Sequence, residues 1–219
     1  MKNTFLYFLA FLSIFPLSSC KKSQQQTIEV DNKSYINDFE LVQENSMNDT
    51  QIKIRSPKAI IDPLNNDIEI FDSSIQIINK DGNDVLVKSG KSIINNSKNI
   101  IQVYNNVYIS LLETKDAFIR THSFNWDLNT SLINLDNPLD LNFNNTKITA
   151  TKGSYNIDSK LLIIDNSNFI RNIYKSDGTE HYRIEIRSDN AQWYKENNSI
   201  EFSSNNKQVE STIEFLSLK

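Results

Sequence analysis

Ser123–Asn137 reads SFNWDLNTSLINLDN, with apolar residues at alternate positions on both sides of a short polar turn. Ser154–Asn166 (SYNIDSKLLIIDN) repeats this arrangement with a turn two residues shorter. Apolar residues at every second position are typical of β-strands that bury one face, because successive side chains point to opposite sides of a strand. Each segment therefore predicts a β-hairpin, and the two hairpins are of one kind.

The same alternation continues through most of the chain, and no segment after the first residues carries a helical stripe of useful length. Further alternating runs are Ile68/Ile70, Ile75/Ile77, Val85/Val87, Ile101/Val103, Val107/Ile109/Leu111, Leu139/Leu141/Phe143 and Tyr182/Ile184/Ile186. Turn-forming residues separate the runs at Pro63-Leu64-Asn65-Asn66, Asp81-Gly82, Asn105-Asn106, Asn144-Asn145 and Asp177-Gly178. The sequence predicts an all-β protein.

The strand pairs also repeat along the chain. Similar units begin at Ile54-Arg55-Ser56, Val87-Lys88-Ser89, Ile119-Arg120-Thr121, Thr149-Ala150-Thr151 and Ile186-Arg187-Ser188, and their Ser/Thr positions are 33, 32, 30 and 37 residues apart. Regular hairpin-sized repeats predict stacked strand pairs that share one continuous interior. We expect an elongated antiparallel β-jellyroll built from hairpin repeats.

The first residues have the pattern of an export signal. Met1–Cys20 (MKNTFLYFLAFLSIFPLSSC) combines a lysine, an apolar run and small residues, and the run is short for a membrane span. Its end, Leu17-Ser18-Ser19-Cys20, resembles a bacterial lipobox, which implies cleavage before Cys20 and lipidation of that cysteine. The alternative is an ordinary secretory signal with a chance cysteine. We expect a lipoprotein signal peptide at 1–19, lipidated Cys20 with a polar tether at 20–35, and the β-jellyroll domain at 36–219.

Composition and motifs offer little for catalysis. The chain of 219 residues has a formal charge of −4 and a pI of about 5.3, without the concentrated basic face of a nucleic-acid-binding protein. His122 and His181 have no cysteine or second histidine nearby, so neither indicates a zinc site or an activated nucleophile. The sequence does not exclude a glycosidase-like pair of carboxylates, although most acidic residues fall at predicted turns. No P-loop is present, and we expect a non-enzymatic protein without catalytic residues, metal or cofactor.

Four segments share a recognisable pattern: Ile36–Leu41 (INDFEL), Gln51–Ala59 (QIKIRSPKA), Val85–Ile109 and Phe118–Tyr174. Together they resemble the LptC family of periplasmic lipopolysaccharide-transport proteins, including a glycine in Thr151-Lys152-Gly153 where the family commonly has one. It implies an OstA/LptC-like jellyroll that receives lipopolysaccharide from the subunits of an inner-membrane ABC exporter. It also implies a hand-off to a periplasmic bridge protein of similar fold, by a protein held at the membrane in the periplasm, with the inner membrane favoured.

An apolar interior would hold the lipid, since each methylene group removed from water contributes about 0.8 kcal/mol of binding free energy. The alternation and the family resemblance together predict a groove lined by inward-facing Phe71, Val87, Val103, Ile109, Trp126, Leu141, Ile163 and Ile173. The resemblance further suggests that the N-terminal edge near Phe39–Leu41 meets the exporter and that the C-terminal edge meets the bridge protein. That C-terminal edge is expected in Tyr182–Leu218, with Ile200, Phe202, Ile213 and Phe215 packing beneath it.

Two features depart from the family. Well-known members use an N-terminal transmembrane helix where this chain carries the lipobox-like segment, and this chain continues from about Asp177 to Lys219 past the family's usual end. A bridge or outer-membrane accessory protein of the same fold is a second reading. A third, from another class, is a lipid-anchored β-repeat adhesin or structural envelope module, which would not need to bind lipid in its interior.

Overall fold

The computed structural model describes residues 33–45, 50–78, 82, 84–111, 117–205 and 208–215. Every described element belongs to one compact unit, Asn32–Lys219. Cys20 and its predicted signal peptide lie outside the described residues. Within these ranges the protein is built of strands only, which confirms the predicted all-β jellyroll class, and no helix there is long and apolar enough to cross a membrane.

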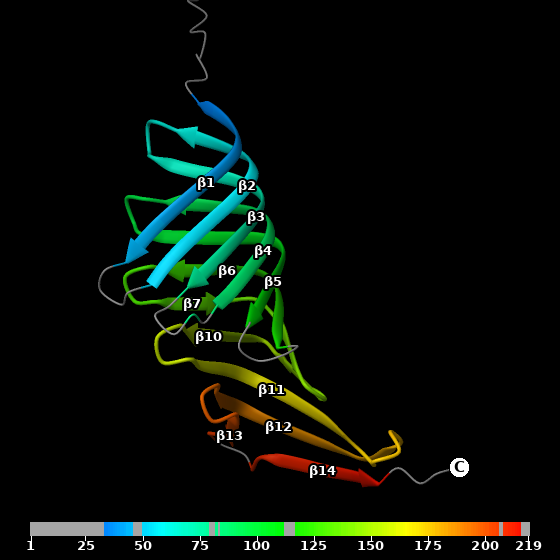
Figure 1. Cartoon of the computed structure of the whole chain (residues 1–219). Coiled ribbons are helices and arrows are strands. Elements are labelled where there is room, and N and C mark those ends of the chain that lie inside the picture. Colours follow the sequence, from blue (N-terminus) through cyan, green and yellow to red (C-terminus); the bar gives the residue numbers. More distant parts are fainter. Residues whose placement is uncertain are drawn as a thin grey trace, which may run out of the picture. The chain divides into compact units, whose positions relative to one another are not determined.

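All the strands belong to one antiparallel sheet (Figure 1). The strands are β1 Ser34–Asn45, β2 Thr50–Asp62, β3 Asp67–Ile78, β4 Asp84–Asn95, β5 Ile100–Leu111, β6 Phe118–Asp127, β7 Leu132–Leu135, β8 Leu139–Phe143, β9 Thr146–Ala150, β10 Lys152–Asn156, β11 Leu161–Tyr174, β12 Glu180–Tyr194, β13 Ser199–Ser203 and β14 Glu210–Phe215. From β1 to β6 each strand pairs with the next along the chain. Beyond β6 the pairing divides, because one half of β6 pairs with β8 and the other half with β7.

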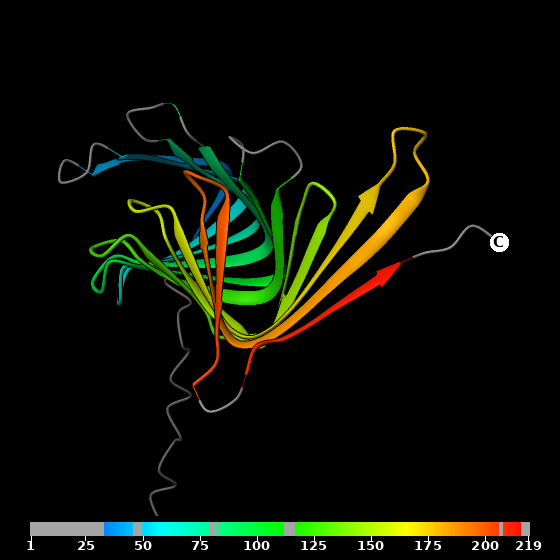
Figure 2. The same cartoon turned by 90° about the horizontal axis from the view of Figure 1, so that it is seen from below.

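The division makes two walls, since the long strands bend and run through both (Figure 2). We call "first wall" the segments 39–45, 50–56, 73–78, 84–89, 107–111, 118–121, β8, β9, 167–174, 180–188 and β14. We call "second wall" the segments 34–37, 58–62, 67–71, 91–95, 100–104, 123–127, β7, β10, 161–165, 190–194 and β13. The buried apolar residues of both walls form a single core.

The corner between the walls is lined by buried hydroxyl groups. Ser73 Oγ lies 2.8 Å from Ser89 Oγ and 2.9 Å from Ser92 Oγ, and Ser167 Oγ lies 2.8 Å from Ser188 Oγ. These hydrogen bonds satisfy polar groups that burial would otherwise leave without partners. Four of the five Ser/Thr positions that begin the sequence repeats are buried corner residues, namely Ser56, Ser89, Thr121 and Ser188. The repeated Ser/Thr residues thus lie where the strands bend.

Backbone geometry at the corner corrects one turn prediction. Asn105-Asn106 was expected to be a turn between strands, but both residues lie inside β5 with φ angles of 63° and 56°. They form the bulge at which β5 passes from the second wall to the first, and the register shifts there between Tyr104 and Val107. Asn residues tolerate this left-handed backbone conformation, so the same chemistry serves a bulge or a turn. The expected turns at 63–66, 144–145 and 177–178 do lie between strands.

Candidate functional site

The inner face of the first wall carries a continuous apolar row. Its members are directly paired from strand to strand: Leu41, Ile54, Ile75, Val87, Ile109, Ile119, Leu141, Ile148, Phe169 and Ile186. The middle of this first-wall row is fully buried, with Val87, Leu141 and Ile148 at 0% exposure. Leu41 and Ile186, at its two ends, are only partly buried. The row is therefore closed along its length and more open towards both edges of the sheet.

The second wall carries a matching row. Its paired members are Ile61, Ile68, Ile94, Ile101, Trp126, Ile133, Tyr155, Leu162, Trp193 and Ile200. No residue of this second-wall row or of the first-wall row is charged. The two rows thus run across the strands from β2 to β12, and they suit a ligand with hydrocarbon chains better than a polar substrate.

Five of the eight residues predicted to line a groove lie in this interior. Val87, Ile109 and Leu141 belong to the first-wall row, Trp126 belongs to the second-wall row, and Val103 lies on the inner face of the second wall. Each of the five is at most 2% exposed. Their contact with a lipid stays a prediction.

The inward positions predicted for Phe71 and Ile163 are wrong. Phe71 lies on the outer face, where the Nζ atoms of Lys58 and Lys91 are 5.5 and 5.9 Å from its ring centroid, while its neighbour Ile70 is buried. Ile163 is 37% exposed between the fully buried Leu162 and Ile164. In both strands a residue with positive φ, Asp72 or Asn166, resets the alternation at the corner. Counting by twos across the corner therefore selects the wrong face.

Ile173 lies near the far end of β11, beyond the fully buried part of the core. It pairs with Tyr182, which pairs in turn with Phe215 of β14. Ile173 is partly buried, and Phe215 is 72% exposed. The eighth predicted groove residue therefore lies beside Tyr182 at the far end of β11 and β12, outside the closed interior.

Aromatic contacts join the two walls towards the C-terminal side of the sheet. The rings of Phe143 and Trp193 stack at 4.7 Å between centroids, and those of Phe169 and Phe202 meet edge to face at 5.3 Å. Sequence reasoning singled out neither Phe143 nor Trp193 for the interior. The available signal for Trp193 was its alternation with buried Ala191, which places both residues on one face of β12.

The interior is packed with side chains rather than hollow. Val87, Val103 and Leu141 have 0% exposure, so no water-sized space adjoins them. Such dense packing is usual in a protein core. An acyl chain could lie between the walls only if the walls move apart.

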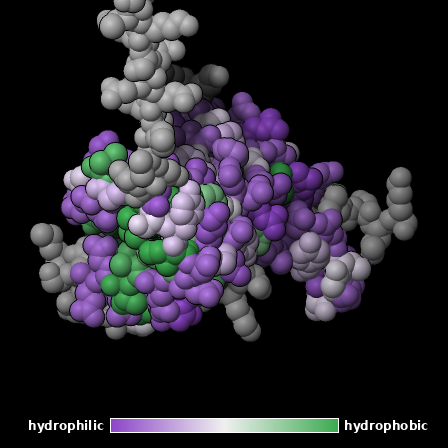
Figure 3. All heavy atoms as spheres, turned by 90° about the horizontal axis from the view of Figure 1, so that it is seen from above, coloured by the Kyte–Doolittle hydropathy of each residue, from purple (hydrophilic) through white to green (hydrophobic). Residues whose placement is uncertain are grey.

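β1 is the N-terminal edge of the sheet, because it pairs only with β2 among the described strands. Apolar side chains gather at this end (Figure 3); Tyr35 and Val42 are exposed, and Ile36, Phe39 and Leu41 are partly buried against the core. An edge strand with free backbone N–H and C=O groups is a site for pairing with another strand. This edge includes the segment Phe39–Leu41 that was expected to meet a partner.

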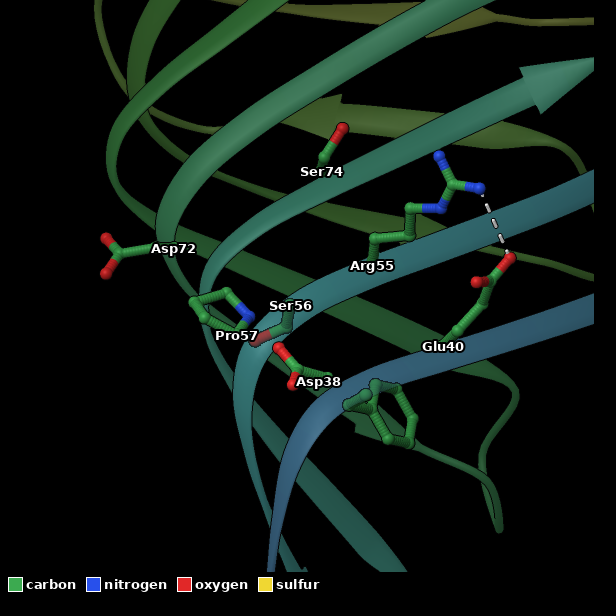
Figure 4. A pocket seen from close by; sticks show the side chains of 8 residues that line it. Asp38, Glu40, Arg55, Ser56, Pro57, Asp72 and Ser74 are labelled. Carbon is green, nitrogen blue, oxygen red and sulfur yellow. Dashed lines mark ion pairs between the residues drawn. The ribbon is translucent and has the colours of Figure 1, made fainter.

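Beside that edge, a hollow lined mainly by polar residues lies at the corner (Figure 4). Glu40 of β1 forms ion pairs there with Lys53 Nζ at 3.0 Å and with Arg55 at 3.5 Å. The hydrogen bond from Lys53, together with the Arg55 charge, lowers the pKa of Glu40 below its ordinary value. These pairs fasten β1 to β2 on the outer face.

The C-terminal edge is formed by two short strands, since β14 pairs with 182–187 of β12 and β13 with 190–194. Ile200 and Phe202 are partly buried and pack against the core, as expected. Ile213 and Phe215 do not pack beneath the edge, because they are 56% and 72% exposed. β14 thus presents exposed side chains along its whole length.

Potential metal-binding side chains do not cluster in the described part of the chain. Among the described residues no group of three or more His, Cys, Asp and Glu side chains is placed to hold a metal ion. His122 and His181 are both exposed. The feature that distinguishes this molecule is the apolar interior with its two edges.

Comparison with known proteins adds one match. A family model described as lipopolysaccharide-assembly, LptC-related, matches residues 5–167, about three quarters of the chain. The match ends at the corner of β11, so that β12, β13 and β14 lie beyond it. A search of curated proteins finds no match.

Proposed function

We propose that this chain, which belongs to the LptC family of lipopolysaccharide-assembly proteins, is a lipid-anchored carrier that holds the acyl chains of lipopolysaccharide between its two walls. Family membership implies a role in lipopolysaccharide transport within the cell envelope, as a transport component rather than an enzyme. The finer proposal is that the carrier receives lipopolysaccharide from an ABC exporter and passes it to a periplasmic bridge protein of similar fold.

The observation that carries the proposal is the pair of uncharged rows that run from strand to strand across the sheet. Each methylene of an acyl chain that leaves water is worth about 0.8 kcal/mol, so several chains bind firmly without polar contacts. The rows continue from β2 to β12 without a charged residue, so a chain that slides along them meets no costly position. A packed interior with a bulged corner supports a carrier that is closed when empty.

Anchoring and partners complete the proposal. Leu17-Ser18-Ser19-Cys20 supports lipidation of Cys20 and attachment to a membrane facing the periplasm, with the inner membrane favoured. The position of β1 at the edge of the described sheet supports docking to the exporter, and the edge formed by β13 and β14 supports docking to the bridge protein. Two open edges on one sheet allow head-to-tail assembly into a longer groove.

Photo-crosslinking in cells tests the carrier. An aliphatic diazirine amino acid at Val103 or Trp126 should capture lipopolysaccharide, because both side chains lie in the interior. The controls are Gln102 and Asn125, their neighbours on the outer face, where Gln102 Nε2 donates a hydrogen bond of 3.3 Å to Asn125 Oδ1. Equal labelling at inner and outer positions would argue against a lipid-lined interior and favour the structural module.

Replacement of Cys20 by serine tests the anchor separately. A released or unprocessed protein is the expected result, since serine lacks the thiol that would carry the lipid and stable anchoring needs the acyl chains. If the Cys20→Ser protein stays membrane-bound at its normal size after alkaline washing, the lipid anchor is refuted while the carrier proposal stands.

A further inference from the structure

Two buried indole groups in the interior have no hydrogen-bond partner among the described residues. Trp126 and Trp193 are 2% and 0% exposed, and neither Nε1 atom has an acceptor within reach. Buried tryptophan N–H groups usually find an acceptor, because an unpaired donor in an apolar interior is costly. They are the only tryptophans of the chain, and both have the same unmet requirement.

Both indoles lie in the second-wall row. Cross-strand pairing connects them directly through Ile133, Tyr155 and Leu162. Four steps between neighbouring strands separate them, or about 19 Å at about 4.8 Å per step. The unpaired donors therefore mark two positions along a row that carries no charged residue.

We propose that the indole N–H groups of Trp126 and Trp193 donate hydrogen bonds to the ester or amide carbonyl oxygens of acyl chains held between the walls. This inference rests on the proposed carrier function and deepens it, because it names the atoms of the lipid that the interior recognises. A phenylalanine at either position would also bury an aromatic ring in the row, but it would add no hydrogen-bond donor. The carrier then selects acylated lipids over hydrocarbon of the same length.

The surroundings favour a carbonyl over a phosphate as the acceptor. No residue of the second-wall row is charged, and an anionic group held there would lose its hydration without gaining a cation. A carbonyl oxygen is neutral, accepts hydrogen bonds and is joined to the chain that the row would bury. The carbonyl oxygen of the lipid thus matches the indole N–H group as a hydrogen-bond acceptor. The hydrocarbon chain of the same lipid matches the apolar residues of the second wall.

Trp193 also shows how the donor becomes available. Its indole stacks on Phe143 of the opposite wall at 4.7 Å between ring centroids. Parting of the walls would separate the two rings and open space beside the indole. A lipid chain that takes the place of Phe143 beside Trp193 then meets an N–H group already fixed in direction by β12.

Nuclear magnetic resonance of the indole groups gives a direct test, because the full-length chain has only two indole ¹H–¹⁵N signals. The probe is purified lipopolysaccharide added to the detergent-solubilised protein, and Trp126→Phe and Trp193→Phe assign the signals. Both signals should move downfield on saturation, as hydrogen-bonded N–H groups do. Signals that stay in place while lipopolysaccharide binds overturn the inference and leave the carrier function intact. Absence of any binding refutes the carrier function itself.

Affinity provides a second readout. The double variant Trp126→Phe/Trp193→Phe should bind lipopolysaccharide about fourfold to a hundredfold more weakly, since each of the two neutral hydrogen bonds is worth about twofold to tenfold in affinity. Phe124→Leu is the matched control, because it shrinks a buried ring of the same wall without removing a donor. If a variant fails to fold, benzothienylalanine at the same position keeps the ring shape and lacks the N–H group. Equal loss in the control and in the double variant would show that only ring volume matters.

Discussion

The rings of Phe143 and Trp193 lie almost parallel, at 12° between planes and 4.7 Å between centroids, although they belong to opposite walls. Phe143 ends β8 in the first wall, and Trp193 lies in β12 of the second wall. Phe143 is 7% exposed and Trp193 is fully buried. The stack therefore holds β12, a strand of the C-terminal extension, against the first wall.

Loss of this stack should destabilise the domain. We expect Phe143→Ala to lower the free energy of unfolding by about 3–5 kcal/mol and Phe143→Leu to cost less, because leucine refills part of the cavity. A double-mutant cycle of Phe143→Leu with Trp193→Leu should give a coupling of about 0.5–1.5 kcal/mol, measured by urea unfolding. Strict additivity of the two changes would show that the rings do not stabilise each other.

The two faces of β11 can be distinguished by a matched pair of substitutions. Ile164→Asn should cost more than about 3 kcal/mol, because it places an amide without partners at a position that is 0% exposed. Ile163→Asn changes a residue that is 37% exposed and should cost under about 1 kcal/mol. Thermal unfolding followed by circular dichroism compares them. Similar losses for both would contradict the outward position of Ile163.

The sequence predicts the strands well because alternation is a local property. Val87, Ile109 and Leu141 were placed correctly, since each lies in a run that stays on one side of a corner. Val103 was also placed correctly, because the two-residue bulge at Asn105-Asn106 keeps odd-numbered residues inward on both sides of the corner. Local periodicity therefore suffices to predict the inward-facing residues wherever the alternation is continuous or shifts by an even number of residues.

The wrong predictions for Phe71 and Ile163 arise where the alternation shifts by an odd number of residues. In β3 the inward residues change from Ile70 to Ser73, and in β11 from Ile164 to Ser167. Alternation cannot reveal this shift, because it depends on the backbone angle of a single residue such as Asp72. The contact between the walls was out of reach for a related reason, since no local pattern shows which side chains meet across the interior. The repeated Ser/Thr residues were the available sign of the corner.

Gly153 is required by close packing rather than by its backbone angles. A Cβ atom there would lie 2.8 Å from the Ile163 carbonyl oxygen and 2.9 Å from Ile164 Cγ2. The carbonyl belongs to the paired strand β11 and cannot retreat, so Gly153→Ala should destabilise by about 1–3 kcal/mol. Gly90→Ala is the control, because its nearest contact is a looser 3.2 Å to Asn105 Cβ, and it should cost less in the same urea titration. An equal or reversed order would rule out this packing reason.

The titration of Glu40 reports on the attachment of β1. Its pKa is lowered chiefly by the hydrogen bond from Lys53, so the ion pair stabilises β1 above the ordinary carboxyl pKa and this contribution is lost as pH falls through the lowered value. Lys53→Met should raise the Glu40 pKa towards its ordinary range, as followed by the side-chain carboxyl carbon signal. Lys33→Met in the first described residues leaves this pair intact and should not move it. A Glu40 pKa that is unchanged in Lys53→Met would show that the ion pair is absent in solution.

The last prediction concerns β14, the strand at the C-terminal edge. All six of its side chains are exposed, and it pairs only with 182–187 of β12 among the described strands. Deleting Gln208–Lys219 therefore removes little buried surface from the described part of the chain, and the protein should stay folded with a melting temperature within about 4 °C of the full chain. The truncated protein should still co-purify with the exporter through β1, but it should no longer capture the bridge protein, because strand addition uses the backbone of the edge strand. The double variant Ile213→Asn/Phe215→Asn keeps that backbone and should keep most of the capture, which separates pairing through the backbone from a contact made by the apolar side chains. If the truncated protein retains the bridge protein at full affinity, the docking edge lies elsewhere, and the free side of β13 is then the remaining C-terminal edge to test.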